Sequence, residues 1–273
     1  MPTDTRRIGG PEESFSPLAY TLTDSIKTLM VSSNGIRNDG RKCEDLRKMF
    51  IKTGVISQAR GSAYIEQGET KIICSVYGPR EVVRKEEFSM KGQLTCEFKY
   101  ATFSCSYRRQ HQQDSEEKDF SVQLLEALEP AVCLHKFPKA QVNIFVEVLQ
   151  NDGSALAASI TCASMALADA GIEVYDLVIG CSMKIHEDKV LTDPTINEEY
   201  DSQNSKQLNH GSLTIGFMPS LNQISAITSK GEIQIDFLKR AMTDCVEACQ
   251  KIYPAMQQSL HSSIKDKLNA SER

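Results

Sequence analysis

The sequence lacks three features that would each point to a particular class of protein. It contains no run of about 18 apolar residues, and its opening, MPTDTRRIGGPEES, has no apolar segment like that of a secretory signal. It also lacks a basic excess, because the formal net charge is −5 and the pI is near 5.6. A free-standing nucleic-acid binder is usually basic over a whole face. We therefore expect a cytosolic or nuclear protein without a membrane partner, in which any contact with RNA is local.

The cysteines do not predict a disulfide framework. There are nine of them, an odd number, and several lie within apolar runs. Reduced and mostly buried thiols are the simpler interpretation. The closest pair, Cys245 and Cys249, lies one helical turn apart in a segment without nearby histidines, so we predict no metal site there.

The chain, with 273 residues of which 40% are hydrophobic, can bury a sizeable core. Residues 1–35 are polar and weakly periodic, which predicts a partly flexible extension, followed by a domain over 36–262 and a tail over 263–273. Helical spacing predicts helices over residues 120–134, 155–170 and from 235 onward, with a kink or restart at Pro130. Strand patterns cover residues 55–59, 62–67, 70–77, 94–103, 142–149, 177–185, 213–218 and 223–228. This order predicts an α+β fold in which helices cover mixed sheets.

Four stretches, taken in order and spacing, resemble the RNase PH family. They are RNDGR (37–41), GSAYIEQGETKIICSVYGPRE (61–81), LLEALEPAV (124–132) and SMALADAGI followed by DLV (164–178). The resemblance extends from about residue 36 to 260. It implies the RNase PH fold, which is like domain 2 of ribosomal protein S5, and descent from phosphorolytic enzymes. The opening RRIGGPEES and the turn GSALAAS resemble most closely a ring subunit of the eukaryotic RNA exosome.

The resemblance implies a non-catalytic subunit that scaffolds the exosome core and lines its channel for single-stranded RNA during 3′-to-5′ processing and degradation. Such subunits serve rRNA processing and mRNA turnover in the nucleus, nucleolus and cytoplasm. The implied partners are other RNase PH-like subunits in a hexameric ring and cap subunits with OB or KH folds, while bound hydrolytic nucleases cut the RNA. No cofactor is expected. The alternative is an active phosphate-dependent 3′-to-5′ exoribonuclease.

The stretch QNDGSALAAS is typical of a strand end, a glycine turn and a helix start, whose free amides can hold a phosphate. In active family members a Gly-Thr-Arg or Gly-Ser-Arg turn holds inorganic phosphate, and the resemblance places this turn on Gly153, Ser154 and Ala155. A guanidinium clamps phosphate through two charge-assisted hydrogen bonds, which a methyl group cannot replace. We therefore predict a structural glycine turn, with Ser154 near the helix N-cap, rather than a working phosphate site.

The family's acidic pair, which positions a metal ion and protonates the leaving oxygen, falls on Asp193 and Glu199. The second acid is longer than the family's aspartate by one methylene, and a further family aspartate falls on Ser212. Without the resemblance, Asp193-Pro194 is simply a turn starter and the acids after it form a solvated loop. We favour the latter interpretation, because a metal pair without its phosphate partner has little chemistry to support.

The family's RNA-contacting arginines fall on Arg80, in GPRE, and on Arg108 and Arg109, in YATFSCSYRRQH. Two arginines in a polar loop are usually just solvated, and Glu81 is placed to hold Arg80 locally. With the resemblance, we expect the three arginines to contact RNA, since sequence-independent binding needs only positive charge along a path. Bases can also stack on the aromatic residues of the same loop, Tyr100, Phe103 and Tyr107.

Overall fold

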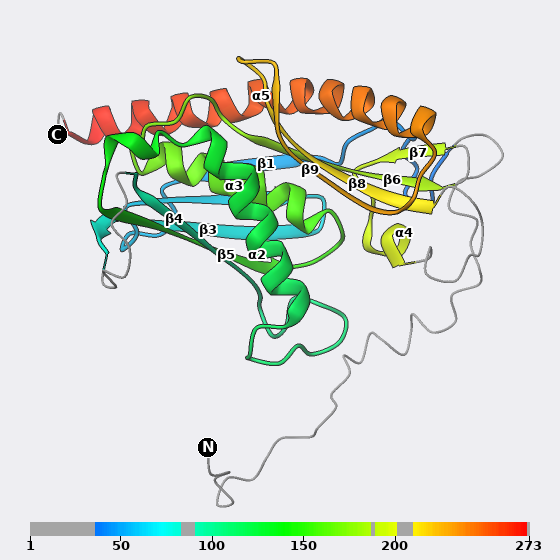
Figure 1. The fold of residues 1–273 in the computed structure, drawn as a ribbon, viewed down its shortest axis with the longest axis horizontal. Coiled ribbons are helices and arrows are strands. Elements are labelled where there is room, and N and C mark those ends of the chain that lie inside the picture. Colours follow the sequence, from blue (N-terminus) through cyan, green and yellow to red (C-terminus); the bar gives the residue numbers. More distant parts are fainter. Residues whose placement is uncertain (1–35, 83–90, 187–188, 201–209, 272–273) are drawn as a thin grey trace, which may run out of the picture.

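Two β-sheets contain the strands of the structure, a computed structural model that describes residues 36–82, 91–186, 189–200 and 210–271 (Figure 1). The five-stranded sheet has the order β1 (Met49–Thr53), β2 (Gly61–Gln67), β3 (Thr70–Glu81), β5 (Ala140–Gln150) and β4 (Gln93–Tyr100). The four-stranded sheet has the order β7 (Lys189–Thr192), β6 (Ile179–His186), β8 (His210–Met218) and β9 (Gln223–Glu232). Strands β4 and β5 are parallel and the other pairs are antiparallel, so the predicted α+β fold with a mixed sheet is confirmed.

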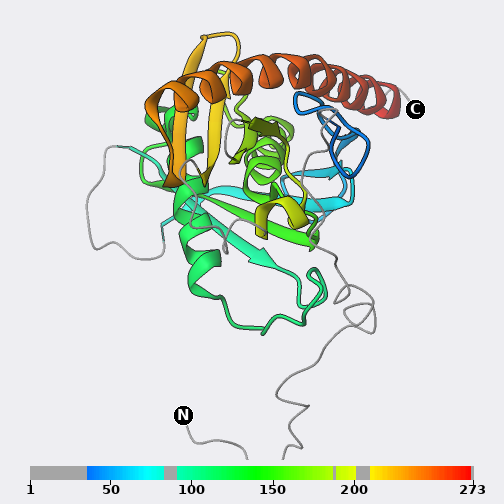
Figure 2. The ribbon, with the colours of Figure 1, turned by 90° about the vertical axis from the view of Figure 1, so that its right-hand side faces the viewer.

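Helices lie between the sheets and along one side of them. They are α2 (Ser115–Leu128), α3 (Ala155–Asp169), α4 (Ile196–Tyr200) and α5 (Ile235–Ser271), with short 3₁₀ turns η1 (Glu129–Ala131) and η2 (Leu134–Lys136) after α2. Figure 2 shows α3 beneath α5, with the strands of one sheet on one side of it and those of the other sheet on the other side. The start of α3 is therefore held by both sheets at once.

Helix α3 is buried nearly all round, which its small side chains permit. A Cβ at Gly180, in β6, would lie 2.1 Å from the Ala157 carbonyl oxygen, and a Cβ at Gly61, in β2, would lie 2.5 Å from that of Ala166. Only glycine allows the strands to approach this closely. The Gly180 amide also donates to Thr161 Oγ1 at 2.9 Å, so this hydroxyl of α3 satisfies a buried donor of the strand.

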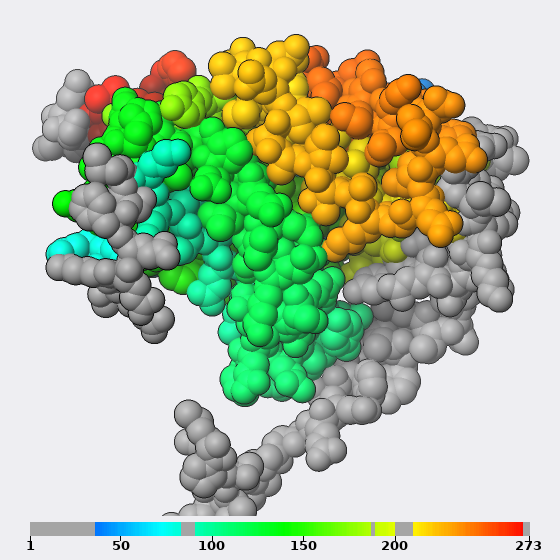
Figure 3. Space-filling view, in the orientation of Figure 1, coloured from blue at the N-terminus to red at the C-terminus, as the bar shows by residue number. Residues whose placement is uncertain are grey.

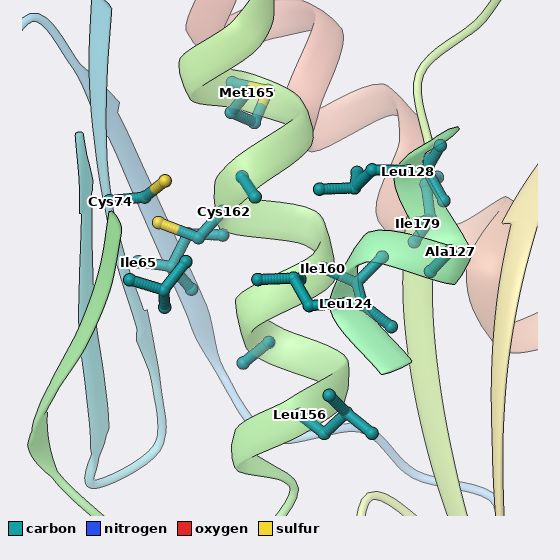
Figure 4. Packing of buried hydrophobic residues seen from close by; sticks show 14 of the residues in the cluster. Ile65, Cys74, Leu124, Ala127, Leu128, Leu156, Ile160, Cys162, Met165 and Ile179 are labelled. Atoms are coloured by element: carbon teal, nitrogen blue, oxygen red, sulfur yellow. The ribbon is translucent and has the colours of Figure 1, made fainter. Parts of the chain in front are cut away.

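The hydrophobic core surrounds α3 on two sides (Figure 4). On one side Cys162 lies against Ile65 and Cys74 of the five-stranded sheet, and on the other side Ile160 lies against Leu124 of α2. All nine cysteines are free and six are buried, as the sequence predicted. The two layers of apolar contact fix the position of α3, and with it the turn that precedes the helix.

Several helices and strands begin or end at other residues than the sequence predicted. The prediction of a strand over residues 55–59 is wrong. The structure has strand β1 earlier in the chain, and β1 ends before Gly54, which adopts a positive φ of 71°. Helix α2 starts at Ser115 instead of residue 120, since Glu117 accepts the Asp114 amide at 2.8 Å and so begins the helix earlier. The predicted restart at Pro130 is confirmed, because α2 ends at Leu128 and Pro130 lies in the 3₁₀ turn η1 that follows it.

Helix α5 continues through residue 262 to Ser271, with Pro254 inside it. Its predicted apolar stripe is buried at Cys245, Cys249 and Met256 but exposed at Ile264 and Leu268. The proposed division at residue 262 and the extension over 1–35 stay predictions, and the extension lies outside the described residues. Within the described ranges, the helices do not have the length and apolarity that crossing a membrane requires.

Candidate functional site

A cleft of about 220 Å³ opens at the N-terminus of α3. Its walls come from α2, from the first turn of α3, from α4 and from the strands β6, β8 and β9. Four of the residues singled out in the sequence line it together: Ser154, Ala155, Glu199 and Ser212. The structure therefore assembles the positions that the resemblance grouped, although they are far apart in the chain.

The turn before α3 needs glycine. Gly153 has a φ of 85°, and a Cβ there would lie 2.5 Å from the Pro194 carbonyl oxygen. Ser154 follows in the left-handed region, with a φ of 54°, and occupies the N-cap position of α3. Its hydroxyl donates to the Pro194 carbonyl oxygen at 3.1 Å, so it holds the neighbouring loop instead of capping the helix.

The Glu199 carboxylate is hydrogen-bonded to the backbone amide at the start of α3. Its Oε1 accepts a hydrogen bond from the Ser154 amide at 2.8 Å. Burial raises the pKa of Glu199 to about 7, although the Ser154 amide and the positive charges of Arg47 and Lys184 act in the opposite direction. A side chain of the protein therefore occupies the place at the α3 N-terminus where an external anion would bind.

Asp193 forms a buried ion pair with Arg47. Its carboxylate accepts from Arg47 Nε at 2.9 Å and from Arg47 Nη2 at 2.6 Å. Burial alone would raise the pKa of Asp193, but the hydrogen bonds and charge of Arg47 hold it below its ordinary value. The same guanidinium donates to the carbonyl oxygens of Asp152 at 2.8 Å and Gly153 at 3.2 Å. Asp193 and Arg47 thus fix the turn before α3.

Among the described residues, no cluster of three or more acidic, histidine or cysteine side chains is placed to hold a metal ion.

The prediction of a solvated acidic loop after Pro194 is wrong. Glu198 is buried in α4, and its Oε1 accepts from Arg37 Nε at 2.9 Å. Arg37 also donates to the Thr192 carbonyl oxygen at 2.6 Å, and Arg41 donates to that of Asp193 at 3.3 Å. The arginines of RNDGR therefore neutralise and hold this segment, and nothing in the local sequence around Glu198 signals those distant partners.

Two lysines of the cleft were missed in the sequence. Lys184, in β6, and Lys230, in β9, flank Ser212 on adjacent strands and line the cleft with it. Burial lowers the pKa of Lys184, against the influence of the nearby Glu199 charge. The signal that could have found them is the alternation of polar residues on one face of three neighbouring strands, which requires the strand pairing to be known.

The structure separates the two arginines that we expected to face RNA together. Arg108 is exposed, whereas the side chain of Arg109 is only 3% exposed. The Arg109 guanidinium lies 4.1 Å from the ring centre of Tyr100, which is itself buried, and its Nη2 is 3.1 Å from Glu116 Oε2. Arg109 is therefore part of the loop's interior, and an RNA strand at the surface can reach Arg108 alone of the two.

Arg80 does not join this site. It is exposed near the end of β3, and its guanidinium lies 5.2 Å from the ring centre of Tyr77. Strand β3 begins at Thr70, whose hydroxyl donates to the Gly153 carbonyl oxygen at 2.9 Å, so the turn before α3 lies at the other end of the strand. At about 3.3 Å per residue, this separates Arg80 from the turn by roughly 30 Å.

Comparisons with known proteins agree with this fold. Residues 45–173 match the 3′ exoribonuclease family, domain 1, also called RNase PH. The chain is 38% identical over 276 residues to the human exosome complex component MTR3, covering 95% of each protein. It is 36% identical over 233 residues to the exosome complex component Rrp41 of Cenarchaeum symbiosum, covering 85% of this chain and 93% of that protein.

Solved structures show the same fold. Rice Rrp46 superimposes with a TM-score of 0.71 at 25% identity, over 82% of this chain and all of that one. A chain of the Archaeoglobus fulgidus exosome, solved with RNA bound to its active site, gives a TM-score of 0.68 at 21% identity, over 81% and 92% of the two chains. The chain therefore belongs to the RNase PH family, and the relatives that it resembles are exosome components.

Proposed function

We propose that this protein is a non-catalytic ring subunit of an RNA exosome core, which scaffolds a six-membered ring of RNase PH-like subunits and lines its RNA path. The similarity to MTR3 over nearly the whole chain supports this role. Its partners are sister RNase PH-like subunits, cap subunits with OB or KH folds and single-stranded RNA. It acts in 3′-to-5′ RNA processing and degradation in the nucleus, nucleolus and cytoplasm.

The observation that carries the non-catalytic assignment is the hydrogen bond between the Ser154 amide and the Glu199 carboxylate. The Glu199 side chain takes the amide that an attacking phosphate would need and repels that phosphate whenever it is ionised, while Ala155, beside it, offers only a methyl group. Loss of one positioned electrostatic contact typically costs on the order of 10² to 10³ in rate. Here the defects add up, because Asp193 is held by Arg47 and Ser212 stands where an acid is expected.

The alternative function, an active phosphate-dependent exoribonuclease, has one supporting observation. Lys184 and Lys230 line the cleft and supply positive charge close to the turn. Lysine binds phosphate as a point charge without the paired geometry of arginine, so the cleft is able to attract an anion but not to orient it as a guanidinium does.

A phosphorolysis assay tests the proposal. The protein is purified with a sister RNase PH-like subunit whose own catalytic residues have been removed, and is incubated with single-stranded RNA, Mg²⁺ and inorganic phosphate. We expect no release of nucleoside diphosphates by the wild type, nor by Ala155→Arg, because arginine alone leaves Glu199 on the helix start. A known active RNase PH serves as the positive control. Phosphate-dependent release by the wild type would refute the assignment.

A further inference from the structure

We propose that His186 and His210 form a two-histidine site for a divalent transition-metal ion such as Zn²⁺, at one end of the four-stranded sheet. The two side chains lie on neighbouring strands, and their ring centres are 4.6 Å apart. Imidazole is the commonest metal-binding side chain and suits zinc, nickel and copper ions. The site uses other residues than Asp193 and Glu199, on which the family's metal-positioning acids fall, and it does not depend on the proposed function.

The register of the strands brings the two histidines together. His186 is the last residue of β6 and His210 is the first residue of β8, and the antiparallel pairing places them directly opposite each other. Side chains in this relation point to the same face of the sheet, with Cβ atoms about 4.5 to 5.5 Å apart. The rings are stacked, with an angle of 30° between their planes. The fold therefore forms a pair from histidines that are distant in the chain.

His210 is buried without the hydrogen bonds that a buried histidine normally makes. Its side chain belongs to a residue that is 9% exposed, and within the described ranges neither Nδ1 nor Nε2 has a hydrogen-bond partner. Most buried polar side-chain atoms are paired, and an exception points to a bound water or ion. In a neutral imidazole one nitrogen carries a lone pair, which is the group that binds a metal ion.

The backbone around His210 is held closely between neighbouring segments. Gly231, in β9, has a φ of 100°, and a Cβ there would lie 2.2 Å from the His210 carbonyl oxygen. A Cβ at Gly211 would lie 2.5 Å from Ile233 Cγ1, so neither position accepts a side chain without a shift of the strands. Figure 3 shows β9 and the start of α5, coloured gold to orange, forming the surface over this part of the sheet. A ligand on such strands is placed more precisely than one on a loop.

A small movement of the two rings is enough to bind an ion. Zinc lies about 2.0 to 2.1 Å from a histidine nitrogen, so two nitrogens that share a tetrahedral zinc ion are roughly 3.3 Å apart. The ring centres are 4.6 Å apart, and rotation about the Cβ–Cγ bonds, which is a soft torsion, turns one nitrogen of each ring toward a common point. His186 is only partly buried, so an ion reaches the pair from its side.

The charged groups beside the pair come from the two outer strands. Lys189, in β7, lies opposite His186, and Glu232, in β9, lies opposite His210. Both are exposed, so water screens their opposite effects on a cation. Within the described ranges no third acidic, histidine or cysteine side chain joins the two rings as a ligand, so water completes the coordination. Two ligands supply about half of the binding free energy of a four-ligand structural site, which corresponds to a dissociation constant on the order of 10 µM.

The pair continues the polar face of the cleft at the α3 N-terminus. Residues two apart on a strand share a face, so His186 follows Lys184 in β6, and His210 precedes Ser212 in β8. Lys184 and Ser212 both line the cleft. A metal ion bound by the two histidines therefore adds positive charge at the outer end of this face.

Calorimetric titration of Zn²⁺ into the full-length protein, purified with a sister RNase PH-like subunit and stripped of metal with a chelator, tests the inference. The double variant His186→Gln with His210→Gln gives the baseline, because it retains every other metal ligand, including the nine free thiols. We expect the wild type to bind one more ion per chain than the double variant. Each single variant should weaken this site at least about tenfold, since one imidazole is half of the ligand set. Binding should also weaken between about pH 7.5 and about pH 5.5, because a protonated imidazole does not bind metal.

His135→Gln is the matched control, because His135 is an exposed histidine that also stacks on a ring, that of Tyr175. It should leave zinc binding unchanged. Circular dichroism verifies that each variant is folded, and His186→Gln, which alters a partly exposed side chain, decides the question if His210→Gln does not fold.

Three results would overturn the inference. A wild type that binds no more zinc than the double variant has no site at the pair. A single variant that binds as tightly as the wild type shows that the two histidines do not act together. Displacement of the zinc by an equal concentration of Mg²⁺, a hard cation that prefers oxygen ligands, would place the ion at carboxylates instead.

Discussion

Replacing Glu199 with glutamine should stabilise the protein more at about pH 8 than at about pH 5. Burial raises the pKa of Glu199 in the folded state to about 7, from an ordinary value of 4.5. A carboxyl group whose pKa is raised by folding contributes stability that is complete below its unfolded pKa and is lost as the pH rises through the folded value. Glutamine does not titrate, so the variant lacks this loss.

The size of the effect follows from the two pKa values. The difference of 2.5 between about 7 and 4.5 corresponds to roughly 3 kcal/mol, at 1.36 kcal/mol for each pKa unit. Relative to the wild type, the free energy of unfolding of Glu199→Gln should therefore rise by about 3 kcal/mol between acid and mildly alkaline pH, with most of the rise between about pH 5 and pH 7. The Ser154 amide can still donate to the glutamine side-chain oxygen, so the hydrogen bond at the helix start is retained.

Urea unfolding of both proteins at four pH values between about 5 and 8 measures this difference. Glu116→Gln is the matched control, because it removes a charge from the same cleft, but its side chain is 47% exposed and is screened by water. The control shows whether removal of any carboxylate from the cleft reproduces the effect of Glu199→Gln. A stability difference between wild type and Glu199→Gln that stays constant over the whole range would show that folding does not raise the pKa of this carboxyl group, and the argument from burial would be refuted.

Three further predictions concern stability and assembly. Asp193→Asn should lower the free energy of unfolding by about 3 to 5 kcal/mol in urea titrations, since it removes the closer of the two carboxylates that pair with the buried Arg47 and leaves only Asp152, at 3.4 Å. An effect below about 1 kcal/mol would contradict this. Gly180→Ala should lower the free energy of unfolding by about 1 to 3 kcal/mol, because its Cβ would lie 2.1 Å from the Ala157 carbonyl oxygen. In the same urea titrations Gly171→Asn should be nearly neutral, because this position has a φ of 70° and open space around it. Addition of a sister RNase PH-like subunit should raise the melting temperature of the chain, as expected for a large apolar interface, and a stable monomer that gains nothing from the partner would argue against an obligate heteromer.

The sequence by itself determined the family, the order of most elements and the turn before α3. These features depend on local chemistry that can be read within one segment. Small residues over 155–170 predict a buried helix, the positive φ of Gly153 fits the glycine expected in the turn, and Pro130 marks a restart because proline cannot continue a helix without losing a hydrogen bond. The ordered motifs then identified the fold, since each one alone is weak but their sequence is specific.

Only the tertiary structure decided which charged residues are free to act. Arg37 and Glu198 are 161 residues apart in the sequence and Arg47 and Asp193 are 146 apart, yet each pair forms a buried ion pair. Whether a charge is solvated or buried depends on the partner that the fold brings to it, and a segment's own sequence does not contain that partner. For the same reason Arg108 and Arg109, neighbours in the chain, have opposite environments, because the rings and carboxylates that enclose Arg109 come together only when the loop closes between β4 and α2.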